Sequence, residues 1–183
     1  MILAIDTSAG QCAVALLDGA RSEVRSEAMQ RGHAEALFPM IEDALAVLRG
    51  RYSDLTRIAV CTGPGSFTGL RVGIAAARGI ALGCGIPAIG VTRFEALAAD
   101  HSLPCTIALP GRGGAIYLQA FGEDAIPVGE PYFEAGEAKD ALPDPMRIAR
   151  IALNRAPGVR PAPLYLRDAD AALPREGPPP LLD

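Results

Sequence analysis

Apolar runs and glycine-rich turns alternate through the middle of the chain. The run Ile58–Cys61 suits a buried strand, although its length alone does not exclude a helical segment. The loop Thr62–Phe67 interrupts the apolar pattern with glycine and proline. A helix is then predicted over about Gly69–Leu82, with Thr68 as its capping residue, and a second apolar run covers 88–91. This order of strand, loop, helix and strand predicts a parallel sheet with covered faces.

The N-terminal part of the chain predicts a three-stranded meander followed by a helix. Apolar runs at Met1–Ile5 and Cys12–Leu17 precede a more polar run at Arg21–Ala28, and Asp18-Gly19 is typical of a hairpin turn. The helical period is clearest over His33–Leu48. The later patterns predict helices at Thr92–Asp100 and Pro145–Ala156, and strands at Cys105–Leu109, Ala115–Phe121 and Ile126–Phe133. The fold class is therefore α/β.

The predicted helix His33–Leu48 carries two apolar stripes on neighbouring faces. One contains Leu37, Ile41, Leu45 and Leu48, and the other contains Ala36, Met40, Ala44 and Val47. Since one stripe is enough to pack against a sheet, we infer that the other faces a partner. The alternative is a helix that is deeply buried within its own domain.

Small residues mark the second predicted helix, with Gly69 and Gly73 one turn apart and Ala76 following them. A glycine inside a helix costs up to about 1 kcal/mol relative to alanine, so something must offset that cost. Close approach of another backbone or of a partner helix is the simplest account. Tight packing on its own sheet is the alternative.

Two turns carry candidate phosphate chemistry. A glycine-rich loop that leads into a helix presents backbone N–H groups to an anion, and an Asp-Thr-Ser turn between two strands adds hydroxyls beside a carboxylate. The loop nevertheless matches neither a P-loop, nor a dinucleotide fingerprint, nor a nucleophile elbow. The alternative in both places is an ordinary structural turn. The candidate remnants of a phosphate site are Asp6, Thr7, Ser8, Gly63, Gly65, Ser66 and Thr68.

Composition limits the classes of function. The chain has 183 residues, of which 50% are hydrophobic, and a formal net charge of −4, so it predicts a folded protein without a large basic surface for nucleic acid. No apolar stretch is expected to span a membrane, and no basic region precedes an apolar segment at the N-terminus. We therefore expect a cytoplasmic protein that makes no membrane contact.

The metal-ligating residue types are sparse and scattered. The only histidines, His33 and His101, have no helical spacing to each other, so no metal site is expected. The cysteines are expected to be reduced core residues rather than a disulfide framework or a zinc site: Cys12, Cys61, Cys84 and Cys105.

A linker at His101–Pro104 predicts the boundary between two domains. The first domain covers residues 1–100 and the second, shorter one covers 101–176. A proline-rich tail at 177–183 is expected to be extended or disordered.

Four segments together resemble the TsaB (YeaZ) family: ILAIDTS, GHAEALFPMI, GPGSFTGLRVGIAAARGIA and PLYLRDADA. The third is the most specific, and the resemblance is close over Met1 to about Ala99 and patchy afterwards. It implies an actin-like fold of the sugar kinase, Hsp70 and actin superfamily. The fold would have two related lobes, and the second would be reduced because the chain is short between Phe133 and Met146.

The resemblance implies a non-catalytic scaffold subunit. In that family the subunit pairs with the catalytic relative TsaD, which forms threonylcarbamoyladenosine next to the tRNA anticodon, and the small ATPase TsaE joins them. It also implies homodimers, tRNA contact only through the complex, and no cofactor on the isolated chain, with ATP or ADP possible in the complex. The partner interface would come from the two long helices through His33, Ala36, Met40, Ala44, Val47, Gly69, Arg71, Val72, Gly73 and Ala76.

The sequence departs from the family at one turn. Where an Asp-Ala-Arg segment and a Gly-Glu pair are usual, Pro110, Gly111, Arg112 and Gly114-Ala115 stand here, so both acidic residues are absent. An actin-fold ATPase or small-molecule kinase that uses Asp6 and the loop 63–69 is the alternative function. A serine peptidase that uses Ser66 is a weaker one.

Overall fold

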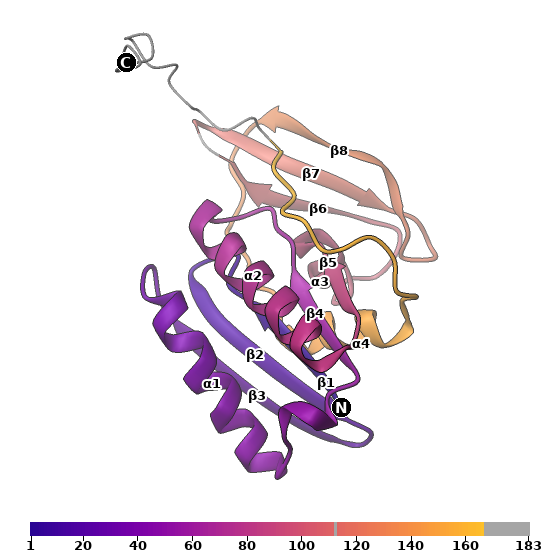
Figure 1. Cartoon of the computed structure of the whole chain (residues 1–183). Coiled ribbons are helices and arrows are strands. Elements are labelled where there is room, and N and C mark those ends of the chain that lie inside the picture. The colour runs from indigo at the N-terminus through magenta and orange to yellow at the C-terminus, as the bar shows by residue number, and fades with distance from the viewer. Residues whose placement is uncertain (112, 167–183) are drawn as a thin grey trace, which may run out of the picture.

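The computed structural model describes residues 1–111 and 113–166, which form two sheets and the helices around them (Figure 1). The first sheet has the strand order β3-β2-β1-β4-β5. Strands β1 to β3 form an antiparallel meander, whereas β1, β4 and β5 run parallel. Its strands are β1 (Ile2–Asp6), β2 (Gln11–Asp18), β3 (Arg21–Ala28), β4 (Arg57–Cys61) and β5 (Ala88–Val91).

Helices cover both faces of the first sheet because successive strand residues point to opposite sides. Helices α1 (His33–Leu48) and α2 (Phe67–Cys84) pack on one face, over Leu3 and Ile5 of β1. Helix α4 (Pro145–Asn154) packs on the other face, over Ile2. Figure 1 shows α1 and α2 side by side in front of the sheet. A short 3-10 helix, η1 (Tyr52–Asp54), leads from α1 towards β4.

The second sheet contains three antiparallel strands in the order β6-β7-β8. They are β6 (Cys105–Pro110), β7 (Ala115–Phe121) and β8 (Pro127–Ala135). Helix α3 (Arg93–Ala98) packs on one face of this sheet, where Phe94 meets Ile107 and Phe121. This arrangement is an actin-like fold with a reduced second lobe.

The hydrophobic pattern of the sequence predicts every helix and strand given above except η1. Prediction and structure differ in where some of these elements begin and end. The expected cap Thr68 is wrong: α2 begins at Phe67, because the Ser66 side chain accepts a hydrogen bond from the Gly69 N–H. Helix α3 ends at Ala98 and α4 at Asn154, earlier than predicted. The tail 177–183 and Arg112 of the atypical turn lie outside the described residues.

The predicted lobe boundary at 100–104 does not separate the chain cleanly. Helix α4, which the prediction assigned to the second lobe, returns to the first sheet and contacts β1, β2 and β4. It returns because Met146, Ile148, Ala149 and Ala152 form one apolar stripe that needs a sheet face to cover it. The first lobe is therefore built from both ends of the described chain.

Helix α2 has the length and composition of a membrane span, with 18 residues and a mean hydropathy of 1.2. The expectation that no stretch could span a membrane is therefore wrong by these two criteria. Its buried residues nevertheless pack on β1 and β4, as those of a core helix do. The core helix of a folded lobe passes the same length and hydropathy criteria as a membrane span, so these two values alone do not distinguish them.

Two buried polar side chains fix the segment that returns from the second sheet to α4. Arg93 is 4% exposed, pairs with Asp140, and donates from Nε to the Ala141 carbonyl oxygen over 3.2 Å. Gln11 donates from Nε2 to the Pro143 carbonyl oxygen over 3.0 Å. These contacts connect the crossing segment to both α3 and β2.

We expect Arg93→Met to lower the free energy of unfolding by about 1–3 kcal/mol, because it removes charge-assisted hydrogen bonds to a partly buried carbonyl. Urea denaturation followed by circular dichroism would measure the loss. Arg150→Met is the matched control, since Arg150 is exposed and forms no ion pair among the described residues, and it should change stability by less than about 0.5 kcal/mol. Equal losses in the two variants would contradict the role assigned to Arg93.

Candidate functional site

The turn after β1 and the loop after β4 meet at the carboxyl ends of their strands. The Ser66 N–H donates to the Ser8 carbonyl oxygen over 2.7 Å, and the Thr7 hydroxyl donates to the Gly69 carbonyl oxygen over 2.7 Å. A Cβ at Gly65 would lie 1.8 Å from the Ser8 carbonyl oxygen. The two candidate phosphate loops are therefore in direct contact with each other.

Asp6 lies inside this contact and is 0% exposed. One carboxylate oxygen, Oδ1, accepts hydrogen bonds from the Ser8 N–H at 2.9 Å and from the Ser8 hydroxyl at 2.6 Å. The other, Oδ2, accepts from Gln11 Nε2 at 3.0 Å. Both oxygens of the carboxylate are thus occupied by neighbours in the same chain, and a metal or substrate could reach them only if this network opened.

The seven predicted phosphate-site residues come together, and several of their polar groups form hydrogen bonds within the chain. Asp6, Thr7, Ser8 and Gly63 are buried, whereas Gly65, Ser66 and Thr68 lie at the surface. The backbone N–H groups of Ser66 and Gly69 already have acceptors. This geometry favours the alternative interpretation, a structural turn. Among the described residues, no group of three His, Cys, Asp or Glu side chains could hold a metal ion.

Gly69 and Gly73 do not face a partner, so that part of the predicted interface is wrong. A Cβ at Gly69 would lie 2.0 Å from the Thr7 carbonyl oxygen, and one at Gly73 would lie 2.4 Å from the Thr7 hydroxyl oxygen. The glycines allow α2 to lie against the end of β1. Tight packing on its own sheet, the alternative considered for these residues, is what the structure shows.

Three other predicted interface residues also lie inside the chain. Ala44 and Ala76 belong to the core cluster between the sheet and the two helices. His33, the first residue of α1, is 8% exposed, and its Nε2 atom has no hydrogen-bond partner within the described part of the chain. These positions are filled by contacts within the monomer, so a partner could not reach their side chains directly.

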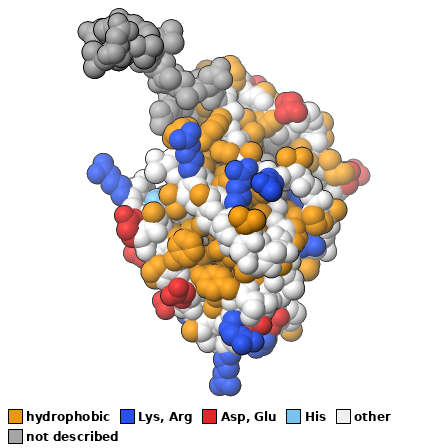
Figure 2. Space-filling model, in the orientation of Figure 1, with side chains coloured by type: hydrophobic (Ala, Val, Ile, Leu, Met, Phe, Trp, Pro, Cys, Tyr) orange, Lys and Arg blue, Asp and Glu red, His pale blue; other side chains and the backbone are white. Residues whose placement is uncertain are grey.

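The remaining predicted residues do reach the surface. Ala36, Met40 and Val72 are half-buried between α1 and α2, and Val47 is 53% exposed. Ala75, which the sequence reasoning missed, is exposed beside them. Figure 2 shows hydrophobic side chains gathered where α1 and α2 lie side by side. We call the surface formed by Ala36, Met40, Val47, Val72 and Ala75 the α1–α2 face.

Arg71 also reaches the surface, on the flank of α2 away from α1. Its guanidinium lies 3.8 Å from the centre of the Phe67 ring, and its Nε donates to the Tyr165 hydroxyl over 3.1 Å. Phe67 and Tyr165 stack with ring centres 5.2 Å apart. Arg71 therefore holds the 161–166 segment onto α2, a role that the sequence pattern did not indicate.

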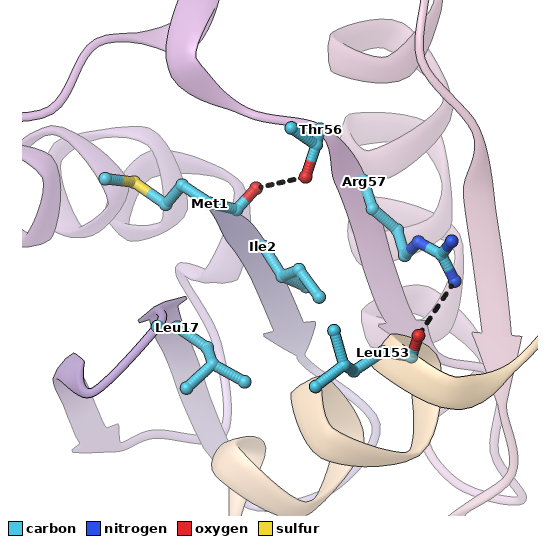
Figure 3. A pocket seen from close by; sticks show the side chains of 7 residues that line it. Met1, Ile2, Leu17, Thr56, Arg57 and Leu153 are labelled. Carbon is cyan, nitrogen blue, oxygen red and sulfur yellow. Dashed lines mark hydrogen bonds between the residues drawn. The ribbon is translucent and has the colours of Figure 1, made fainter.

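A hollow of about 280 Å³ lies at the opposite end of the first sheet (Figure 3). Ile2, Leu17 and Leu153 line it with apolar side chains. The polar groups at its rim have partners: Thr56 donates to the Met1 carbonyl oxygen over 3.1 Å, and Arg57 donates to carbonyl oxygens at the end of α4. Within the described part of the chain, the Thr56 and Arg57 side chains of this hollow are therefore already engaged in hydrogen bonds.

Burial and the Asp6 carboxylate raise the pKa values of two nearby thiols. Burial is the larger cause for Cys12, whose pKa rises from 9.0 to about 11. The pKa of Cys61 is raised further for the same two reasons, although its Sγ donates a hydrogen bond to the Ser8 hydroxyl over 3.3 Å. Both thiols are protonated and unreactive at neutral pH.

The architecture defines an actin-like class of protein whose phosphate loops are closed and whose two long helices present an apolar face. The family model described as TsaD, tRNA N6-adenosine threonylcarbamoyltransferase, matches residues 24–144. The chain belongs to this transferase-related family and, within it, to the TsaB (YeaZ) family.

Curated relatives carry both names. The Escherichia coli K12 tRNA threonylcarbamoyladenosine biosynthesis protein TsaB is 34% identical over 128 residues, which cover 67% of this chain and 55% of the relative. The tRNA N6-adenosine threonylcarbamoyltransferase of Paracoccus denitrificans is 35% identical over 168 residues, 86% of this chain and 44% of the relative. The chain thus spans about half the length of the curated relatives it matches.

Among solved structures, YeaZ from Pseudomonas aeruginosa is similar to this chain with a TM-score of 0.77 and 25% identity. The match covers 90% of this chain and 99% of that one. The small second lobe is therefore shared with a solved relative.

Two glycines of the same helix predict opposite effects. Gly73→Ala should lower the free energy of unfolding by about 1–3 kcal/mol, because the new methyl group would overlap the Thr7 side chain. Gly79→Ala should raise it by about 0.5–1 kcal/mol, because no heavy atom among the described residues lies within 4 Å of that Cβ position. Chemical denaturation of both variants checks the pair, and a stable Gly73→Ala chain would contradict the close contact with β1.

The raised pKa of Cys12 predicts a loss of stability in alkali. Below pH 9 the thiol is protonated in both the folded and the unfolded chain, so it contributes no pH dependence there. As pH rises from 9 to about 11, the unfolded chain loses its thiol proton first, which favours unfolding by about 1–2 kcal/mol. Urea denaturation at several pH values in this range gives the free energy of unfolding at each pH. This free energy should fall less steeply with pH for Cys12→Ala than for the parent chain. An equally steep fall in both chains would contradict the assignment.

Proposed function

We propose that this chain is a non-catalytic scaffold subunit in the formation of threonylcarbamoyladenosine in tRNA. The catalytic step would belong to its relative TsaD, with the small ATPase TsaE as a third member. The observation that carries this proposal is the α1–α2 face, an apolar surface on two helices that already have a complete buried stripe each. The pathway is inferred from the chain's membership of the TsaB family.

The closed phosphate loops support a scaffold rather than a kinase or ATPase. Phosphoryl transfer needs a carboxylate for the metal and backbone amides for the phosphates. Here the Asp6 carboxylate accepts three hydrogen bonds from its own chain, and Gly65 and Gly69 pack directly on Ser8 and Thr7. Opening the site would break these contacts and expose the end of β1.

The chemistry of the α1–α2 face fits a second pair of helices. Met40 and Val72 are half-buried and pack against the core, while Val47 and Ala75 are exposed. A helix with small or aliphatic side chains could cover these residues as helices pack in globular proteins. The same face could pair with a second copy of the chain, so the homodimer and the TsaD complex would compete.

The remaining functional assignments follow from this pairing. The isolated chain would bind no cofactor, and ATP or ADP would be held only in the complex with TsaD and TsaE. Because the chain has a net charge of −4, tRNA would be held by the other subunits. The proposed location is the cytoplasm.

A single substitution in the α1–α2 face tests the scaffold role. Val47→Lys should weaken association with the cognate TsaD by at least about tenfold, because it places a charge in an apolar interface. It should leave thermal stability nearly unchanged, since Val47 is 53% exposed and a lysine suits the end of a helix. Titration calorimetry and size exclusion with purified TsaD are the measurements. Val128→Lys is the matched control, because Val128 is 60% exposed and belongs to β8 of the second sheet.

Two results would overturn the proposal. One is TsaD binding that Val47→Lys leaves intact, which would place the interface elsewhere. The other is steady ATP turnover by the isolated chain, which would favour the actin-fold ATPase or kinase.

A further inference from the structure

A second hollow, of about 470 Å³, lies along the flank of α2 that points away from α1. The C-terminal half of α2 forms one wall, the start of β5 forms the floor, and the segment that follows α4 forms the other wall (Figure 1). Its lining residues are Arg78, Gly79, Ala81, Leu82, Gly85, Ile86, Pro87, Ala88, Pro157, Gly158 and Arg160. We call this hollow the α2 groove.

Most of the described residues that line the α2 groove are apolar, and the charged ones among them, Arg78 and Arg160, are both basic. Leu82 is 82% exposed at its edge, although leucine is ordinarily a core residue of a helix. Arg78 and Arg160 are both exposed, and within the described residues neither forms an ion pair or a hydrogen bond. Two free guanidinium groups therefore flank an apolar floor in a chain whose net charge is −4.

The edge of the groove is open to another backbone. Cβ positions at Gly79, Gly85 and Gly158 have no heavy atom within 4 Å among the described residues. Gly85 is explained by its φ of +66°, which the end of α2 requires. Gly79 has no such explanation, since it lies inside a helix where alanine is more favourable. Its missing side chain leaves room for a chain that lies across α2.

We propose that the α2 groove binds an acidic, amphipathic peptide segment of a protein partner. Aliphatic side chains of the segment would cover Leu82 and Ile86, and its carboxylates would pair with Arg78 and Arg160. Guanidinium groups recognise carboxylates through paired N–H donors, which gives this choice of charge its specificity. The lining has no aromatic side chain on which a base could stack, so a protein segment suits it better than single-stranded RNA.

The proposal does not depend on the scaffold function. The residues of the α1–α2 face and those that line the α2 groove do not overlap, and the groove can be tested on the isolated chain. Failure of peptide binding would leave TsaD association untouched, and loss of TsaD association in Val47→Lys would leave the groove untouched.

The probe is a synthetic peptide of about twelve residues in which pairs of glutamate and leucine alternate. It is added to the ¹⁵N-labelled full chain, and binding is followed through the amide signals of Gly79, Gly85 and Gly158. We expect these signals to shift together, while those of α1 stay in place. The same peptide with lysine in place of glutamate should cause no shift.

Charge-removing variants test the role of the arginines. The double variant Arg78→Gln, Arg160→Gln should weaken binding of the acidic peptide by about fivefold or more, as expected for two partly exposed charge pairs. Its matched control is Arg31→Gln, Arg150→Gln, which makes the same change of net charge at exposed positions outside the groove lining and should change binding by less than about twofold.

A third variant tests the shape of the groove. Gly79→Leu should abolish binding without lowering thermal stability, because the Cβ position is open and the larger side chain enters the groove. The proposal is overturned by an acidic peptide that causes no shift at millimolar concentration, by equal binding of the lysine peptide, or by unchanged binding in the arginine double variant. A twelve-nucleotide uridine RNA that shifts the same glycines more strongly would also overturn it, in favour of a nucleic-acid site.

Discussion

The contact between α2 and the end of β1 is the constraint on which the rest of the structure depends. Gly69 and Gly73 bring the helix so close to Thr7 that its carbonyl and hydroxyl oxygens occupy the place of two missing side chains. The Thr7 hydroxyl then donates to the Gly69 carbonyl oxygen, and the Ser66 N–H reaches Ser8. Because helix and strand are joined here, the phosphate loops are closed and α2 has a fixed orientation towards both α1 and β5.

Under the proposed scaffold function, this closure takes much of the phosphate chemistry out of a kinase-like architecture. Asp6, Thr7, Ser8 and Ser66 are present, but each forms hydrogen bonds within the chain. Asp6 illustrates the change, since its carboxylate links the turn to Gln11 and, through Gln11, to the segment before α4. A group that could hold a metal in an open site holds β1, β2 and the crossing segment together here. The partner surface that we propose therefore lies elsewhere, on the outer sides of α1 and α2.

The sequence predicts the order and type of the elements well, because hydrophobic period and turn residues are local signals. It predicts His33–Leu48 to the residue, and the stripe of Leu37, Ile41, Leu45 and Leu48 packs on the sheet as predicted. It does not separate Gly69 and Gly73 from Gly79 and Gly83, since all four are glycines inside one helix. Only the distances to Thr7 show which of them the fold itself requires.

The sequence assigns Ala44, Ala76 and His33 to a partner for the same reason: the helical period gives the direction of a side chain but not what lies there. Helix α4 is a longer-range case, because no local signal shows that its stripe packs on the first sheet rather than on the second.

The glycines of α2 thus fall into two groups, those packed against β1 and those above open space. The two groups have different consequences for function. A glycine pressed against its own strand reports on the fold, and its substitution changes stability. A glycine above open space gains nothing from the fold, so its cost in helix stability needs another explanation. In this helix the first kind lies in the half next to the closed loops, and Gly79 lies in the half that lines the α2 groove. Along its length, α2 therefore changes from a part of the lobe's interior to an open surface, where we place the binding of another chain.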